Sequence, residues 1–218
     1  MSRLIAFGCS NTYGQGLPDC HLLDRRSDTY GAGPHPSKHA WPSVLGKLLD
    51  RSVVNLGQPG GSNRNIWYTA VNFDYQPDDI VVLHWTFLYR TVVLWQDKAP
   101  LHLGLWNIAE PTIGELYKKF VTAIDSDYDR LVESLVHIDH VNRFLKGKVK
   151  GVLNIVFNPD EFKDLPAWAD INFDICAAPY NIDYPLALDN THTGLQGHKA
   201  LAKDLHKIIV EKTRCNWL

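Results

Sequence analysis

The chain opens with the apolar run Arg3–Gly8, RLIAFG, which is followed directly by Cys9 and Ser10. A short apolar run that ends in glycine is typical of a buried strand that stops at a turn. Four further short apolar runs occupy residues 52–56, 79–85, 151–157 and 171–175, and the first of these also ends at a glycine, Gly57. The sequence therefore predicts five short strands distributed along the chain.

Helical patterns fill the intervals between these runs. Pro42 is suited to the first turn of a helix, and apolar residues follow it at helical spacing. The predicted helices cover residues 41–49, 62–70, 113–145 and 195–210. Because strands alternate with helices, we expect an α/β fold with right-handed crossovers and a parallel sheet of about five strands between two helical layers. No repeat or linker divides the chain, so residues 1–218 are expected to form one domain.

Two segments do not fit this alternation. Residues 17–40 are rich in glycine, proline and histidine, and residues 87–111 carry aromatic side chains with little helical periodicity. Long loops in a compact domain tend to be lids or binding loops. We expect 87–111, which follows the third strand, to form one wall or lid of a pocket, although packing against residues 113–145 would use the same residue types.

The composition excludes several classes of protein. The 22 Lys and Arg residues against 24 Asp and Glu give a net charge of −2. This balance argues against a protein that binds duplex nucleic acid, or that binds a membrane surface through a polybasic patch. The apolar run after Arg3 is too short for a signal peptide, and no window approaches the roughly 18 apolar residues of a membrane span. The four cysteines lack a C-x-x-C pair and are interpreted as reduced thiols. We therefore expect a soluble cytoplasmic protein. The cysteines are Cys9, Cys20, Cys176 and Cys215.

Polar turns follow the first two predicted strands and precede the last helix. In a parallel sheet, the site lies outside the carboxyl ends of the strands. Ser10 follows the first strand, a glycine-rich turn over residues 57–61 follows the second, and Asp189 and His192 precede the last helix. A hydroxyl nucleophile needs a base, an acid that orients the base, and donors for the oxyanion. These turns could supply all of them.

At these turns the sequence resembles the SGNH (GDSL-type) hydrolase family. The stretch FGCSNTYG, residues 7–14, looks like the family's nucleophile block with Ser10 as the serine. Residues 55–60 are similar to the second block, in which Gly60 matches the oxyanion-hole glycine. Asp189-x-x-His192, followed by Gly197-His198, looks like the block that supplies the acid and the base.

The chain departs from the family pattern at two positions. Cys9 stands where the family usually has an aspartate before its serine. The asparagine usual after the third strand is absent, and Thr86 is its nearest positional match, in a Trp85-Thr86-x-x-x-Arg90 stretch that looks like a divergent version of that block. Thr86 is therefore interpreted as a substitute oxyanion donor, with Asn63 as the alternative. Cys9 at the end of a buried strand is interpreted as a core residue rather than a nucleophile.

The resemblance implies a flavodoxin-like three-layer α/β/α sandwich and a serine ester hydrolase or deacylase that forms an acyl-serine intermediate. Ser10 would attack, His192 would accept and return the proton, and Asp189 would orient the imidazole. The oxyanion hole would comprise Ser10, Gly60 and Thr86 or Asn63. No metal or organic cofactor is expected. The substrate would be a small-molecule or glycan ester, contacted by Trp85, Arg90, Trp95 and Trp106.

Two other functions remain open on this sequence. An acyltransferase would use the same serine but pass the acyl group to a hydroxyl other than water. A non-catalytic binding protein could keep the scaffold and lack the third oxyanion donor. Arg90 has an alternative too, because an ion pair with a carboxylate would explain it equally well. His137 and His140 share a helical face with Asp139 nearby, but no further ligand at useful spacing predicts a metal site.

Overall fold

A computed structural model of the protein describes residues 2–24, 29–96, 100–105, 113–123, 126–177 and 179–215. Its centre is a five-stranded parallel sheet in the order β4-β1-β5-β8-β9. The strand of residues 3–8 pairs in parallel on both sides, from Arg3↔Ser52 to Gly8↔Gly57 and from Leu4↔Ile80 to Phe7↔Leu83. The strands are β1 (Arg3–Gly8), β4 (Ser52–Gly57), β5 (Ile80–Trp85), β8 (Gly151–Val156) and β9 (Ile175–Cys176).

The predicted strands are confirmed except for the extent of the last one. The prediction placed it at 171–175, but only Ile175 and Cys176 pair with β8. Asp174 N–H already donates to Asn154 O at 2.7 Å, and the Asp174 carboxylate accepts from Asn154 N–H at 2.7 Å. Before residue 175, one backbone bond and one side-chain bond between Asp174 and Asn154 thus take the place of regular pairing with β8.

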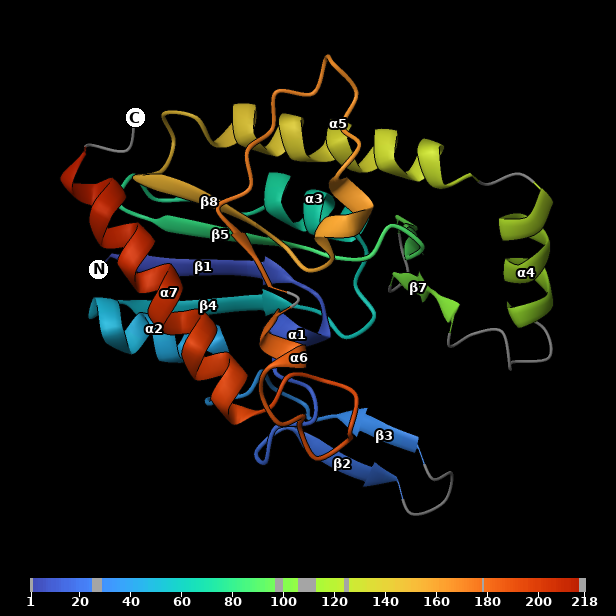
Figure 1. The fold of residues 1–218 in the computed structure, drawn as a ribbon, viewed down its shortest axis with the longest axis horizontal. Coiled ribbons are helices and arrows are strands. Elements are labelled where there is room, and N and C mark those ends of the chain that lie inside the picture. Colours follow the sequence, from blue (N-terminus) through green and yellow to red (C-terminus); the bar gives the residue numbers. More distant parts are fainter. Residues whose placement is uncertain are drawn as a thin grey trace.

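Helices cover both faces of the sheet (Figure 1). Side chains of α2 and α7 pack on one face around Leu4, Ala6 and Val82, and those of α3 and α5 pack on the other around Ile5 and Phe7. This is the predicted α/β/α arrangement. The helices are α2 (Trp41–Leu49), α3 (Asn63–Val71), α5 (Asp127–Leu145) and α7 (Leu195–Arg214).

The predicted helical stretch 113–145 is two helices, α4 (Ile113–Ala123) and α5. Ser126 has an extended backbone, and its hydroxyl accepts a hydrogen bond from Asp129 N–H at 3.1 Å. A serine that caps a helix in this way satisfies an otherwise unpaired N–H and starts a new helix. The apolar period continues across the break, which explains why the pattern alone predicted one helix.

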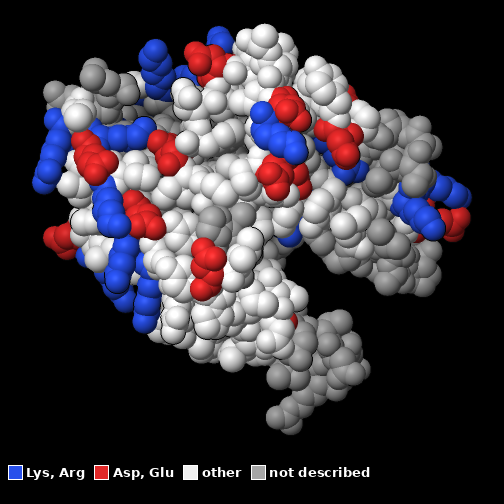
Figure 2. Space-filling model, viewed as in Figure 1, with Lys and Arg blue, Asp and Glu red and all other residues white. Residues whose placement is uncertain are grey.

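Both segments predicted as long loops contain an antiparallel hairpin. Strands β2 (His21–Asp24) and β3 (Thr29–Ala32) pair within the first, and β6 (Thr91–Val93) and β7 (Leu101–Leu103) pair within the second. Figure 1 shows both hairpins beyond the carboxyl ends of the parallel strands, on opposite sides of that edge. The molecular outline is notched on this side in Figure 2. The remaining short helices are α1 (Ser10–Tyr13), η2 (Pro159–Phe162) and α6 (Pro179–Ile182).

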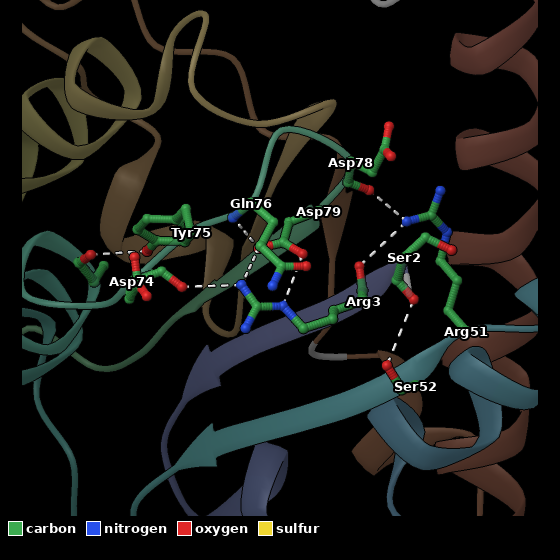
Figure 3. Close-up of polar contacts among 10 residues, drawn as sticks. Ser2, Arg3, Arg51, Ser52, Asp74, Tyr75, Gln76, Asp78 and Asp79 are labelled. Atoms are coloured by element: carbon green, nitrogen blue, oxygen red, sulfur yellow. Dashed lines mark hydrogen bonds and ion pairs between the residues drawn. The ribbon is translucent and has the colours of Figure 1, made fainter.

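An ion pair closes the opposite, amino edge of the sheet (Figure 3). The Arg3 guanidinium donates to both carboxylate oxygens of Asp79, at 2.9 and 2.6 Å, and Gln76 N–H donates to the same carboxylate at 2.8 Å. Burial disfavours the charged Asp79, which is fully buried, but the bond from Arg3 and the one from Gln76 outweigh it and hold its pKa below the ordinary value. The start of β1 is thereby joined to the residue before β5.

No helix within the described ranges has the length and apolar character that crossing a membrane requires.

Candidate active site

Ser10 lies at the turn between β1 and α1. Cys9 is extended, α1 begins at Ser10, and Gly14 ends the helix with φ of 88°. A Cβ at Gly8 would collide with the Thr12 side chain, so only glycine allows α1 to fold back this tightly on β1. The turn presents Ser10 at the carboxyl edge of the sheet, 3% exposed.

Asp189 and His192 form a hydrogen-bonded pair on the loop before α7. His192 Nδ1 lies 2.6 Å from Asp189 Oδ2, and the second carboxylate oxygen accepts from the N–H groups of Thr191 and His192, both at 3.1 Å. Burial disfavours the charged carboxylate, but the neighbouring imidazole and these two N–H bonds together hold the pKa of Asp189 below its ordinary value. Charged Asp189 therefore keeps the imidazole proton on Nδ1 and leaves Nε2 free to accept another.

Contacts on both sides dock this loop onto the Ser10 turn. Thr193 N–H donates to Asn11 Oδ1 at 3.2 Å, and Leu188 N–H donates to Gly16 O at 3.0 Å. Asn11 directly follows Ser10, and Thr193 directly follows His192. The hydrogen bond between Asn11 and Thr193 therefore holds the segments that carry Ser10 and His192 together. Among the described residues, no hydrogen bond joins Ser10 Oγ to His192.

The turn after β4 brings Gly60 to the same edge. Gln58 N–H donates to Gly8 O and Gly61 N–H to Gln58 O, both at 2.9 Å, and Gly60 takes φ of 73°. No hydrogen bond runs from the N–H of Ser10 or of Gly60 to another described residue. The first N–H groups of a helix have no partner within it, so Ser10 N–H is available as a donor.

Asn63 and Thr86, the two side chains predicted as alternative oxyanion donors, are hydrogen-bonded to each other. Asn63 Oδ1 accepts from Thr86 N–H at 2.7 Å, and its amide donates to Thr86 O and to Ser134 Oγ, both at 3.1 Å. Both amide hydrogens are thus used, and Asn63 is 3% exposed. Thr86 is fully buried, and its hydroxyl accepts from Arg90 Nη1 at 3.2 Å. Asn63 therefore has no amide hydrogen left for an oxyanion, and both buried side chains lie at the end of β5.

Trp85 is also wrongly predicted as a substrate-binding residue. Its side chain is fully buried in the core, and its Nε1–H donates to Asn154 Oδ1 at 2.9 Å. A residue without exposed surface cannot contact substrate. Trp95 is 44% exposed, as a substrate-facing residue requires, whereas Trp106 lies outside the described residues.

Arg90 lies close enough to Cys9, the residue before Ser10, for its charge to act on the thiol. Its guanidinium is 4.8 Å from the ring centroid of Phe87 and 5.9 Å from that of Tyr89. Burial disfavours the Cys9 thiolate, but the Arg90 charge and hydrogen bonds involving Thr86 and the adjacent backbone lower the pKa of Cys9 overall. Cys9 is fully buried, so this thiol cannot reach a substrate carbonyl.

Asn11 is the site residue that the sequence did not reveal. Its role depends on a contact with a residue 182 positions away, which leaves no local pattern. Within the described ranges, no group of three or more His, Cys, Asp or Glu side chains is arranged to hold a metal ion.

Comparisons with known proteins bear on this architecture. No protein-family profile and no curated protein matches the chain. Among solved structures, a protein of the G-D-S-L lipolytic family from Desulfitobacterium hafniense superposes with a TM-score of 0.52 at 12% identity, over 94% of this chain and 98% of the other. An acetylxylan esterase from Geobacillus stearothermophilus gives 0.50 at 17% identity, over 94% and 92%.

A family two carbohydrate esterase from Clostridium thermocellum, solved with cellohexaose, gives a TM-score of 0.53 at 12% identity. The match covers 100% of this chain and 65% of that esterase. At such identities the likeness concerns the fold. The strand order, the two helical layers and these neighbours together show that the chain has the SGNH hydrolase fold of the GDSL lipolytic proteins and carbohydrate esterases.

Proposed function

We propose that the protein is a serine ester hydrolase or deacylase. The observation that carries this proposal is the Asp189–His192 pair, held at 2.6 Å on a loop that is docked beside Ser10 through Asn11 and Thr193. An oriented imidazole next to a hydroxyl at the carboxyl edge of a parallel sheet is the arrangement that activates a serine nucleophile.

The residues divide the reaction between them. Ser10 Oγ attacks the ester carbonyl carbon while His192 Nε2 takes the hydroxyl proton, and Asp189 stabilises the imidazolium through Nδ1–H. The N–H groups of Ser10 and Gly60 donate to the oxyanion. His192 then protonates the leaving alcohol, which departs and leaves an acyl-serine. Water attacks this ester with His192 again as base, and Ser10 recovers its proton as the acid product leaves.

The proposed substrate is a small-molecule or glycan ester. This choice is supported by the neighbours, one of which is described as an acetylxylan esterase and another as a carbohydrate esterase in complex with cellohexaose. Trp95, which is 44% exposed, and Arg90, which lies over Phe87 and Tyr89, are the described side chains proposed to contact the alcohol or acyl portion.

Labelling with a fluorophosphonate tests the proposal directly. We expect mass spectrometry of the treated protein to find one adduct, on Ser10, and none in Ser10→Ala, the matched control. An unlabelled wild-type protein, or a label elsewhere that survives in Ser10→Ala, would contradict an activated Ser10. Turnover of an acetyl ester with and without a competing alcohol then distinguishes hydrolysis from acyl transfer.

One observation favours a second candidate, a binding protein without catalysis. Asn63 uses both amide hydrogens in other bonds, and the Thr86 side chain has no exposed surface, so the proposed oxyanion hole consists of backbone N–H groups alone. Loss of one such donor costs about 2.7–4 kcal/mol of transition-state stabilisation in a well-studied serine protease. A protein that binds glycan esters but neither labels on Ser10 nor turns them over would support this candidate.

A further inference from the structure

Three side-chain nitrogens beneath the candidate active site have no hydrogen-bond partner among the residues that the structure describes. They are Trp41 Nε1, His84 Nε2 and His198 Nε2. Trp41 begins α2, His84 is near the end of β5, and His198 is in the first turn of α7; all three residues are at most 1% exposed. Because a buried polar group without a partner is costly, three of them together require an explanation.

All three residues line one small cavity. It leaves about 10 Å³ for the centre of a water molecule, close to the ~10–15 Å³ that a single buried water needs. Asn11 and Thr193 line the same cavity. A space of this size excludes a larger ligand. The three residues with unpartnered nitrogens in its wall distinguish it from wholly apolar cavities, which stay dry.

The proton positions on the two histidines follow from their other contacts. Burial lowers the pKa of His198 to about 3 and that of His84 to about 4, so both rings are neutral near pH 7. His198 Nδ1 accepts a hydrogen bond from Trp41 N–H at 3.0 Å, so its proton is on Nε2. His84 Nδ1 lies 2.9 Å from Thr12 Oγ1, a contact that either tautomer could make.

We propose that one buried water molecule binds between Trp41, His84 and His198. It accepts hydrogen bonds from Trp41 Nε1–H and His198 Nε2–H, which occupies both of its lone pairs, and it donates to His84 Nε2. His84 then carries its proton on Nδ1 and donates it to Thr12 Oγ1. The site joins the ends of α2, β5 and α7 directly beneath the Asn11–Thr193 contact, independently of whether the protein is an esterase.

This arrangement requires opposite tautomers in the two buried histidines. We expect long-range ¹H–¹⁵N spectra near pH 7 to report the Nδ1–H tautomer for His84 and the Nε2–H tautomer for His198. A crystal structure at high resolution should contain an ordered water within about 3.2 Å of all three nitrogens. An empty cavity, or a His84 protonated on Nε2, would overturn the proposal, and both measurements use the unmodified protein.

Two conservative variants sharpen the test. Trp41→Phe removes one donor and keeps an aromatic ring, so the occupancy of the water should fall. Tyr180→Phe alters another residue that lines the cavity, but the Tyr180 hydroxyl already donates to Asp204 at 2.6 Å, so the water should stay. Unchanged occupancy in Trp41→Phe would show that the indole is not a partner and would overturn the three-partner site.

Discussion

Ser10 and His192 come from opposite ends of the chain, and each is oriented by its neighbours rather than by a bond between them. Ser10 begins α1 after a glycine that permits the tight turn, and Asp189 holds His192 from the other side at 2.6 Å. Asn11 and Thr193 connect the two segments at 3.2 Å.

The first prediction concerns these two residues as a catalytic unit. Ser10→Ala and His192→Ala should each abolish turnover of small activated acetyl esters, and the double variant should be little worse than either, because members of one catalytic unit are non-additive. Steady-state kinetics on the three proteins measures this, with circular dichroism to confirm folding. Losses that multiply in the double variant would mean that the two residues act separately.

The second prediction separates the two possible roles of Asn63. Asn63→Ala leaves Thr86 N–H, Thr86 O and Ser134 Oγ without their partner, so the free energy of unfolding should fall by roughly 2–4 kcal/mol. Urea unfolding measures the change. The matched control is Asn72→Ala, which removes an exposed bond to Tyr68 O and should have a much smaller effect. A stable Asn63→Ala protein with a greatly reduced kcat would instead support Asn63 as an oxyanion donor.

The two ends of the parallel strands in the sheet differ in what they carry. Its amino edge is secured by Arg3 and Asp79, whereas its carboxyl edge carries the polar turns and the two hairpins. Substitutions at the amino ends of the strands should therefore change the stability of the protein. Substitutions of exposed residues at the carboxyl ends should change the proposed substrate preference.

The third prediction tests the amino edge. Arg3→Met leaves the Asp79 carboxylate buried with a single N–H partner, and breaking such a pair from one side costs about 3–5 kcal/mol. Replacing both residues, as Arg3→Met with Asp79→Leu, should restore most of that stability. Arg143→Met is the control, because its pair with Asp139 is exposed and contributes at most about 0.5 kcal/mol. A double variant as unstable as Arg3→Met would contradict this account.

The fourth prediction concerns Trp95, which follows β6 at the carboxyl edge. Because Trp95 is 44% exposed, Trp95→Ala should leave the melting temperature nearly unchanged while altering the preference among esters of different acyl or alcohol size. Trp85→Ala is the contrasting control: its side chain is fully buried, and its loss should cost about 3–5 kcal/mol. A large loss of stability in Trp95→Ala with unchanged relative preference would identify Trp95 as a packing residue.

Buried histidines make the free energy of unfolding of the protein depend on pH. Burial lowers the pKa of His84 to about 4 and of His198 to about 3, from the ordinary 6.5. At a pH between the lowered pKa and 6.5, each histidine is protonated in the unfolded chain but neutral in the folded protein. The free energy of unfolding therefore falls as the pH drops below about 6.5. The loss should approach about 3 kcal/mol for each residue by pH 4.

The fifth prediction measures this dependence. Urea unfolding of His84→Gln at several pH values between 4 and 7 should give a shallower dependence on pH than the unmodified protein shows. Phe157→Leu alters packing around the same ring without removing a titrating group, so it should lower stability and keep the slope. Equal slopes in all three proteins would mean that His84 does not titrate on unfolding.

The fold was largely predictable because its signals are local. Apolar runs and helical periods identified β1, β4, β5 and β8 and the helices that cover them, and the order of motif-like turns indicated the SGNH arrangement. What failed depends on distant contacts. The pairing of Asn63 with Thr86, the burial of Trp85 against Asn154, and the short β9 are decided by residues that meet only in the folded protein.

The bond between Thr193 and Asn11 closes a loop of 182 residues. Closing so long a loop lowers the entropy of the chain before the contact contributes any stabilising free energy. Contacts between residues this far apart in the sequence therefore slow folding. β1 precedes both of its neighbours, β4 and β5, in the sequence and needs them to pair, whereas α5 can form from nearby residues alone. On the ribosome, Ser10 is therefore made long before His192, and the contact that holds their two loops together can form only after Thr193 has been made.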